Sequence, residues 1–275
     1  PARPAGGGLS FEDVSLLGAG GVPLLDHVSF DVPRGEILAV AGVQGNGQTE
    51  LAEVILGLQT PDSGVIRLEN ADITRAKPRE SLDAGVGFIP EDRSTDGIIA
   101  SFSISDNLVL DQFRSSSFSA VGSLKRGAIA RNARDKEKEY DIRLTSIEDP
   151  VSSLSGGNQQ KVVVAREMSR DLTLLVANQP TRGVDVGSIE FIHRRIVDVR
   201  DQGCAVLLIS SELDEVVSLA DRIAVMYRGR IVGIVPADTG RDVLGLMMAG
   251  VPLDEAVADS SGSAQESGAP RKEEQ

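Results

Sequence analysis

Short apolar runs separated by glycine-rich turns dominate the first part of the chain. Residues 9–17 and 24–32 have the composition of β-strands, and residues 18–21, Gly-Ala-Gly-Gly, form a turn between them. Residues 37–42 are apolar throughout and run into a glycine-rich loop, after which residues 49–56 show helical spacing. The pattern therefore predicts two β segments, followed by a buried strand, a loop and a helix.

The second half of the chain repeats this alternation. Residues 172–177 and 205–210 have the pattern of strands, and residues 187–201 between them have the pattern of a helix. A strand, a helix and a strand at this spacing predict a parallel pair joined by a crossover. Residues 223–227 and 230–235 are expected to form a closing hairpin. The chain as a whole is therefore expected to have an α/β fold.

Three segments differ from this alternation. Residues 94–157 are more polar and helical, and we interpret the heavily charged stretch 126–140 within them as the solvated face of a helix. Residues 1–8 contain three consecutive glycines and resemble the remnant of a linker. Residues 251–275 hold too few apolar side chains to fold, so we expect a disordered acidic tail. The folded domain is thus predicted to span residues 9–250.

Composition and charge narrow the possible functions. A hydrophobic content of 41% suits a globular protein, and no apolar run approaches the roughly 18 residues that cross a bilayer. The formal net charge of −13 argues against a nucleic-acid partner, because nucleic acids select a basic surface. Cys204 is the only cysteine, which excludes an internal disulfide and fits a reducing cytoplasm. Since the first residue is not Met, we expect the chain to be an excised piece of a longer polypeptide.

The loop after the apolar strand has the spacing of a phosphate-binding loop, G-x-x-x-x-G-K-[ST], with one departure. It reads Gly42, Val43, Gln44, Gly45, Asn46, Gly47, Gln48, Thr49 and Glu50. Backbone N–H groups of such a loop surround phosphate oxygens, and Thr49 can offer its hydroxyl to Mg²⁺. Gln48 stands where a Lys ammonium would bridge the outer phosphates, so phosphate binding should be weaker by about ten-fold or more. This loop alone does not distinguish a nucleotide-binding site from an ordinary glycine-rich turn.

A second glycine-rich turn is more specific. Residues 154–161 read Leu-Ser-Gly-Gly-Asn-Gln-Gln-Lys and lead directly into an apolar helical stretch. The turn presents backbone N–H groups, a hydroxyl and a positive helix end at one point, which suits the terminal phosphate of a nucleotide. The octet resembles the signature motif of ABC-type ATPases, with Ser155, Gly156, Gly157 and Gln159 as its binding candidates. In that family the signature of one domain closes over a nucleotide held by another, so the resemblance implies that this chain works as half of a pair.

The resemblance to ABC ATPases covers roughly residues 9–250. It implies an α/β P-loop NTPase fold, with a RecA-like core, an antiparallel β subdomain and an inserted helical subdomain at about residues 94–157. The chain looks closest to the second nucleotide-binding domain of the tandem ATPases of bacterial simple-sugar importers, and residues 178–193 are similar to the nucleoside-importing branch. The resemblance also implies ATP and Mg²⁺ as cofactors.

The partners implied by the resemblance are those of an importer. They are an intact ABC domain, transmembrane permease subunits and, indirectly, a substrate-binding protein. The expected location is therefore the cytoplasmic face of the bacterial inner membrane, with residues 91–108 as the segment that contacts the membrane subunit in the family.

Several positions that carry the chemistry of the family are substituted here. Asn178 stands where the family has an Asp that organises Mg²⁺, and Gln179 stands at the general-base Glu. Ser211 replaces the switch His, and Glu91 replaces the Gln of the Q-loop. Loss of a general base costs about 10²–10⁴ in rate. The residues that could still contact Mg²⁺ are Thr49, Glu91 and Asn178, and we expect them to form only a weak Mg²⁺ site.

These departures imply an asymmetric mechanism. Ser155, Gly156 and Gly157 would complete a hydrolytic site in the partner, while the phosphate loop of this chain would hold a nucleotide with slow or no turnover. Asp185, at the D-loop position, is expected to lie at the seam between the two domains.

Two alternatives stay open. A non-catalytic scaffold that binds no nucleotide is favoured by Gln48 and by the lack of an aromatic residue in 16–22, where the family stacks adenine. A soluble ABC ATPase acting on DNA or translation factors is disfavoured by the net charge and by the absence of long coiled-coil arms.

Overall fold

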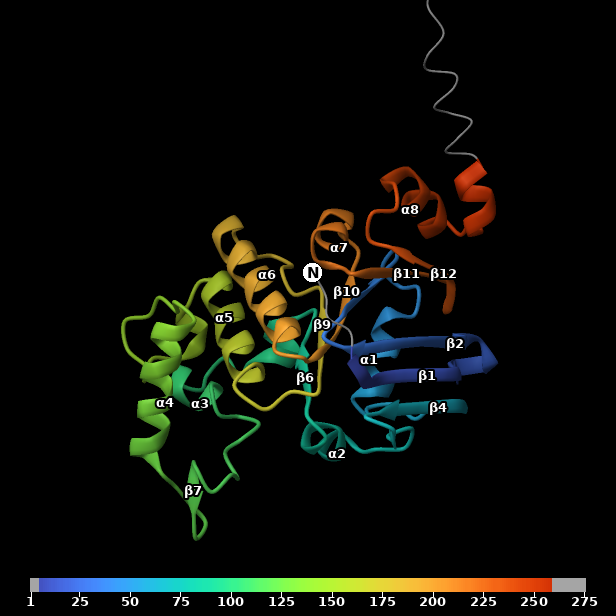
Figure 1. The fold of residues 1–275 in the computed structure, drawn as a ribbon. Coiled ribbons are helices and arrows are strands. Elements are labelled where there is room, and N and C mark those ends of the chain that lie inside the picture. The colour runs from blue at the N-terminus through green and yellow to red at the C-terminus, as the bar shows by residue number, and fades with distance from the viewer. Residues whose placement is uncertain (1–4, 259–275) are drawn as a thin grey trace, which may run out of the picture.

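The computed structural model describes residues 5–258. A central six-stranded sheet lies between an antiparallel sheet on one side and a helical lobe, formed by residues 94–155, on the other (Figure 1). The central sheet has the strand order β12-β11-β3-β10-β9-β6, and β12 is its antiparallel edge strand. Its strands are β3 (Ile37–Ala41), β6 (Val86–Ile89), β9 (Leu174–Asn178), β10 (Ala205–Ser210), β11 (Arg222–Tyr227) and β12 (Arg230–Pro236). The predicted parallel pair, β9 with β10, and the predicted hairpin of β11 and β12 are both present.

Strand β3 is buried on both faces. Its alternate side chains Ile37, Ala39 and Ala41 enter a core formed with helices, whereas Leu38 and Val40 enter a core formed with the antiparallel sheet. A strand covered on both faces needs an uninterrupted apolar sequence, which explains the run at residues 37–42. The helices on the first face are α5 (Gly156–Glu167), α6 (Val186–Asp201), α7 (Leu213–Leu219) and α8 (Arg241–Met248), and α1 (Gln48–Ile55) lies on the second.

The antiparallel sheet begins earlier than the sequence suggests. Its strands, in the order β2-β1-β4-β5, are β1 (Ala5–Leu17), β2 (Pro23–Arg34), β4 (Ser63–Leu68) and β5 (Ala71–Asp72). Residues 5–8, which we expected to be linker, belong to β1, and the Gly8 N–H donates to Glu69 Oε1 at 2.8 Å. A side chain at Gly8 would lie 2.1 Å from the Val32 carbonyl oxygen, so glycine is required here by the close approach of β2. Residues 1–4 of that prediction lie outside the described residues.

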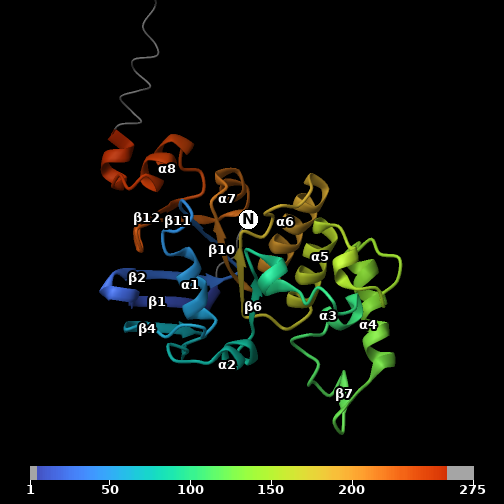
Figure 2. The ribbon, with the colours of Figure 1, turned by 180° about the vertical axis from the view of Figure 1, so that it is seen from behind.

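The helical lobe projects from the central sheet, as Figure 2 shows from behind. Its only helix of more than two turns among residues 94–155 is α4 (Arg126–Glu139), which buries Ile129 and Ala133 and exposes most of its charged side chains. A two-stranded hairpin at the far end of the lobe was not predicted. The remaining short elements are η1 (Ala19–Gly21), α2 (Pro78–Asp83), η2 (Arg93–Gly97), α3 (Ile104–Asn107), β7 (Ser119–Ala120), β8 (Ser123–Leu124) and η3 (Val151–Ser153).

The folded part extends past residue 250. Residues 253–258 are helical, Ala256 is fully buried, and Leu253 packs against the core that contains α8. The boundary predicted at residue 250 is therefore too early, because two apolar side chains are enough to anchor this short helix. Residues 259–275 of the predicted tail lie outside the described residues. Across residues 5–258, no helix has the length and apolar character needed to span a membrane.

Candidate functional site

Parallel strands bring the candidate residues together at one edge of the sheet. Glu91 follows β6, Gln179 follows β9 and Ser211 follows β10, and the carboxyl ends of these strands share one edge. In open α/β sheets this edge is where ligands bind. With Gln44 from the loop after β3, these three side chains line a cavity of about 650 Å³. The structure thus places Glu91, Gln179 and Ser211 in a common site, as their positions in the sequence suggested.

The loop between β3 and α1 has the backbone geometry of an anion nest. Gly45 (φ 88°) and Gly47 (φ 106°) adopt left-handed conformations that glycine accepts without strain. Gly42 has no room for a side chain, because a Cβ atom there would lie 2.6 Å from the Met226 carbonyl oxygen. Asn46 fastens the loop to the β11–β12 turn, because its Oδ1 accepts the N–H of Arg228 at 2.8 Å. At the start of α1, Thr49 is exposed and Glu50 is half-buried.

Gln48 fills this nest with its own carboxamide. Its Oε1 accepts the Asn46 N–H at 2.9 Å, and its Nε2 donates to the Val43 carbonyl at 3.0 Å. The side chain is only 8% exposed. A backbone N–H that a phosphate oxygen would contact is therefore already satisfied by a neutral group from the same loop, and a nucleotide has to displace that group.

The general-base and switch positions form a neutral pair. Gln179, in a left-handed conformation (φ 49°), donates from Nε2 to Ser211 Oγ at 3.0 Å. Beside them, Asn178 is buried at the end of β9. An amide and a hydroxyl can orient a water molecule, but at neutral pH neither accepts a proton from it. This part of the site can bind and orient, and it lacks a base.

A buried carboxylate lies deeper in the same cavity. Glu215 Oε1 accepts a hydrogen bond from Thr181 Oγ1 at 2.7 Å and lies 3.0 Å from His193 Nε2. These contacts hold the residues after β9 against α6 and α7. His193 and Glu215 cannot be recognised as neighbours from the sequence, because their proximity depends on the packing of two helices that are separate in the sequence.

The proposed metal ligands do not fit a resident Mg²⁺ ion. Glu91 supplies the one carboxylate of the set, and it forms an ion pair with Arg182 and accepts a 2.6 Å hydrogen bond from Gln44 Nε2. Thr49 and Asn178 contribute only neutral groups. Mg²⁺ favours carboxylates together with phosphate oxygens, and within residues 5–258 no group of three His, Cys, Asp or Glu side chains could hold a metal.

The signature turn presents its serine at the start of α5. Ser155 caps this helix: its exposed hydroxyl accepts hydrogen bonds from the Asn158 side chain at 3.0 Å and from the Asn158 N–H at 3.4 Å. A side chain at Gly156 would lie 2.5 Å from Arg93 Nη2, and one at Gly157 would lie 2.3 Å from Asp185 Oδ2. Gly157 therefore has a packing reason in addition to any role in binding, because Asp185 and Ser188 are held by their mutual hydrogen bond, whereas the Arg93 side chain could move away from a larger residue at Gly156.

Gln159 has a different role from the one its motif position suggests. Its Nε2 donates to the Leu154 carbonyl at 3.0 Å and to the Val151 carbonyl at 3.4 Å. These bonds brace the turn that precedes Ser155. The geometry thus supports a structural role for Gln159 rather than direct contact with a ligand.

Arg93 and Asp185 connect the signature turn with its neighbours. Arg93 donates to the carbonyl oxygens of Arg182 at 3.1 Å and of Gly183 at 3.4 Å, and it packs beneath Gly156. Asp185 caps α6, and hydrogen bonds from the Ser188 hydroxyl and N–H hold the pKa of Asp185 below its usual range. Arg93 is not among the predicted site residues, although its position directly after Pro-Glu-Asp at a strand end is a usable signal.

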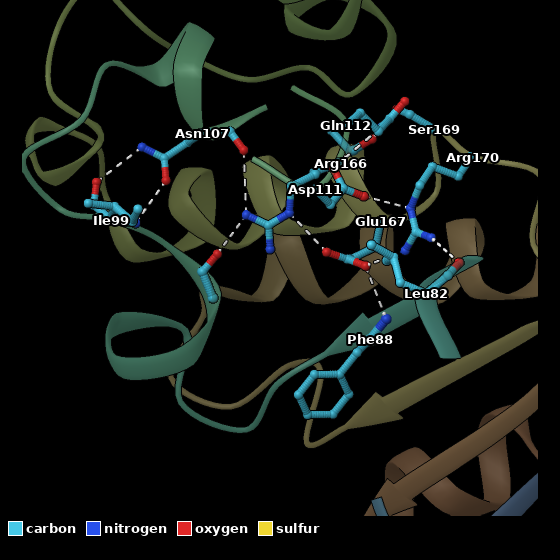
Figure 3. A network of polar contacts seen from close by, with 12 residues as sticks. Leu82, Phe88, Ile99, Asn107, Asp111, Gln112, Arg166, Glu167, Ser169 and Arg170 are labelled. Atoms are coloured by element: carbon cyan, nitrogen blue, oxygen red, sulfur yellow. Dashed lines mark hydrogen bonds and ion pairs between the residues drawn. The ribbon is translucent and has the colours of Figure 1, made fainter. Parts of the chain in front are cut away.

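The other end of α5 is held by a buried ionic network (Figure 3). Glu167 accepts hydrogen bonds from Arg166 Nε at 2.9 Å, Arg170 Nη2 at 3.0 Å and the Phe88 N–H at 3.1 Å. Arg166 donates to the Gly97 carbonyl at 2.8 Å, and Arg170 lies 2.6 Å from Asp111. Burial, with a smaller effect from Glu167, raises the pKa of Asp111. The signature helix is therefore fixed to the segment that follows β6.

Comparison with known proteins agrees with this geometry. Residues 25–182 match the family model described as ABC transporter. The chain belongs to the ABC transporter family of ATP-binding proteins. Its fold matches solved ABC cassettes: MJ1267, an ATP-binding cassette of an ABC transporter, aligns with a TM-score of 0.74 at 24% identity over 90% of this chain and 98% of that one. The dimeric ADP-bound cassette MJ0796 aligns with a TM-score of 0.72 at 19% identity, over 84% of this chain and 100% of that one. The ABC fold implied by the sequence is thus confirmed.

Two curated members of the ABC family are similar over most of this chain. The nucleoside import ATP-binding protein NupA of Lactococcus lactis is 44% identical over 255 residues, which cover 92% of this chain and 50% of NupA. The guanosine import ATP-binding protein NupO of Bacillus subtilis is 42% identical over 256 residues, 93% of this chain and 50% of NupO. The chain spans about half the length of these ABC relatives.

Proposed function

We propose that this domain is one half of the ATPase of an importer for nucleosides or simple sugars. The relatives act, by their names, in nucleoside and guanosine import, and others are named for ribose import. The chain spans half the length of such relatives, and its sequence resembles the second nucleotide-binding domain of tandem importer ATPases, so we propose that it is the second domain of such an ATPase. Its partners are then an intact ABC domain and transmembrane permease subunits, and its place is the cytoplasmic face of the membrane.

The exposed start of α5 is the observation on which this function rests. The Ser155 hydroxyl and the N–H groups of Gly156 and Gly157 lie at the positive end of a twelve-residue helix. They would bind the terminal phosphate of an ATP molecule held in the phosphate loop of the paired domain. Asp185 and Arg93 pack against the two glycines, so they would fix the position of this turn at the seam.

The domain's own half-site is proposed to bind ATP weakly and to turn it over slowly or not at all. Gln48 occupies the nest without charge, and the Gln179–Ser211 pair cannot abstract a proton. Mg²⁺ would enter only with the oxygens of a bound triphosphate, since the protein ligands alone do not fit it. The residues of this half-site would therefore hold a nucleotide in place while the partner site performs hydrolysis.

Replacing Gln48 with Lys should strengthen nucleotide binding. The ammonium would form charge-assisted contacts with the outer phosphates in place of the neutral internal bonds, and we expect the Kd of the isolated chain for MgATP to fall about ten-fold or more. Isothermal titration measures this change. Gln202→Lys is the matched control, because it adds the same charge to an exposed position after α6, near the opposite edge of the sheet. An unchanged Kd for Gln48→Lys would show that the loop is not a phosphate site.

A non-catalytic scaffold that binds no nucleotide is the second candidate, and the buried carboxamide of Gln48 favours it. Titration of the isolated chain with MgATP separates the two functions. Thermal stabilisation that rises through millimolar nucleotide is expected for the weak half-site. A melting temperature that does not respond to MgATP, in a chain that still supports hydrolysis by an added ABC domain, would favour the scaffold.

A further inference from the structure

The far end of the helical lobe carries a charge opposite to that of the chain. Residues 112–134 contain no Asp or Glu, whereas the whole chain has a formal net charge of −13. The basic side chains of this segment are Arg114, Lys125, Arg126, Arg131 and Arg134, all of them exposed. We call residues 112–134 the basic tip. Such segregation produces a local positive field on an acidic protein.

Most of these charges are free to meet a partner. Arg126 is paired with Asp106 at 2.6 Å. In the part of the chain that the structure describes, the other four basic residues of the tip form no ion pair. Lys125 donates to the Ser116 carbonyl at 2.6 Å, and Arg114 lies over the ring of Phe113. These contacts orient the cations and leave their charge unneutralised.

Apolar side chains are exposed among the charges. The hairpin of β7 and β8 projects from the end of the lobe in both views (Figures 1 and 2). Val121 at its turn is fully exposed, and Phe113 and Leu124 are 43% and 37% exposed. Val121 has a φ of 49°, a left-handed conformation that is unusual for a β-branched residue. The tip therefore combines protruding apolar groups with unneutralised cations.

We propose that the basic tip docks on the anionic headgroups of a lipid bilayer. Arginine and lysine side chains would bind lipid phosphates, and Val121 with its apolar neighbours would enter the interface between headgroups and acyl chains. Charge complementarity selects this partner, because the basic tip carries five basic side chains and no acidic one, and an anionic surface attracts such a segment even when the whole domain is acidic. The proposal rests on the membrane location given under the proposed function, and its test contains neither nucleotide nor a paired domain.

Sedimentation with vesicles tests the proposal on the purified chain. We expect binding to phosphatidylcholine vesicles that contain phosphatidylglycerol, no binding to pure phosphatidylcholine, and loss of binding at high salt. The triple variant Arg114→Gln, Lys125→Gln and Arg131→Gln should bind about ten-fold or more weakly. The matched control Arg228→Gln, Arg230→Gln and Arg241→Gln removes three charges near β12 and α8, at the opposite end of the molecule (Figure 1), and should bind like the native chain.

Two results would overturn the proposal. One is equal sedimentation of the native chain with both kinds of vesicle. The other is an equal loss of binding in the two triple variants, since that would reflect net charge rather than the tip. Thermal melting of each variant shows that it is folded before the comparison is made. If vesicle binding fails while MgATP still stabilises the chain, the lipid contact is wrong and the proposed ATPase function stands.

Discussion

Replacing Ser155 with Arg should reduce ATP turnover by the paired domains about 10²–10³-fold. The substitution removes the hydroxyl and places a long side chain over the N–H groups that would face the phosphate, and loss of such donors has effects of this size. Phosphate release from this chain mixed with the intact ABC domain measures the effect. The isolated chain should show negligible turnover with or without the substitution.

Ser152→Arg is the matched control for this experiment. Ser152 is exposed in η3, three residues before the signature serine, and its side chain makes no hydrogen bond to the described residues. The same added bulk and charge there should leave turnover close to that of the native pair. Because Ser155 also caps α5, the melting temperature of each variant has to be recorded. Turnover that survives Ser155→Arg in a folded pair would contradict the role given to the signature turn.

Replacing Glu167 with Gln should destabilise the domain by about 3–5 kcal/mol. Glu167 is 6% exposed, and it accepts hydrogen bonds from two guanidinium groups and from a backbone N–H. A neutral amide in its place leaves the buried Arg166 without its carboxylate partner and takes one of two carboxylates from the half-buried Arg170, which keeps Asp111. Removing one partner of a buried ion pair in this way is strongly destabilising. Urea denaturation followed by circular dichroism gives the change in the free energy of unfolding.

Asp83→Asn provides the comparison for Glu167→Gln. It makes the same chemical change in the exposed i,i+4 pair of Arg79 with Asp83. Exposed pairs contribute at most about 1 kcal/mol, so this variant should remain near the native stability. An equally small change in the free energy of unfolding for both variants would contradict this role of the network in Figure 3. The signature helix would then be fixed to the segment after β6 by other contacts.

Local patterns in the sequence predicted the parts of the fold that depend on local physics. The uninterrupted apolar run of β3, the glycine-rich loop after it and the serine cap of α5 each reflect a requirement that operates within a few residues. The boundaries were harder to predict. Gly6, Gly7 and Gly8 look like a linker in sequence, but the structure uses glycine at residue 8 because β2 passes too close for a side chain.

The sequence motifs indicate some of the residues that line the cavity, such as Glu91, Gln179 and Ser211, but not their contacts, nor the neighbouring His193 and Glu215. The sequence shows that Gln48 lacks the expected positive charge, but the hydrogen bonds of its side chain to Asn46 and Val43 depend on the shape of the loop. Glu91 was expected to face a metal, and the structure pairs it with Arg182, which is 91 residues away. Contacts between segments so far apart in sequence are set by strand order, which the residues around Glu91 do not encode.

We propose that the pair has one hydrolytic site, which is completed by the signature of this chain and located in its partner. Trapping with vanadate and radiolabelled ATP counts such sites directly, because the trapped ADP marks each site that has turned over. We predict one trapped nucleotide per pair, held by the partner domain, and none in the isolated chain. Two trapped nucleotides per pair, or trapping by this chain alone, would contradict the account.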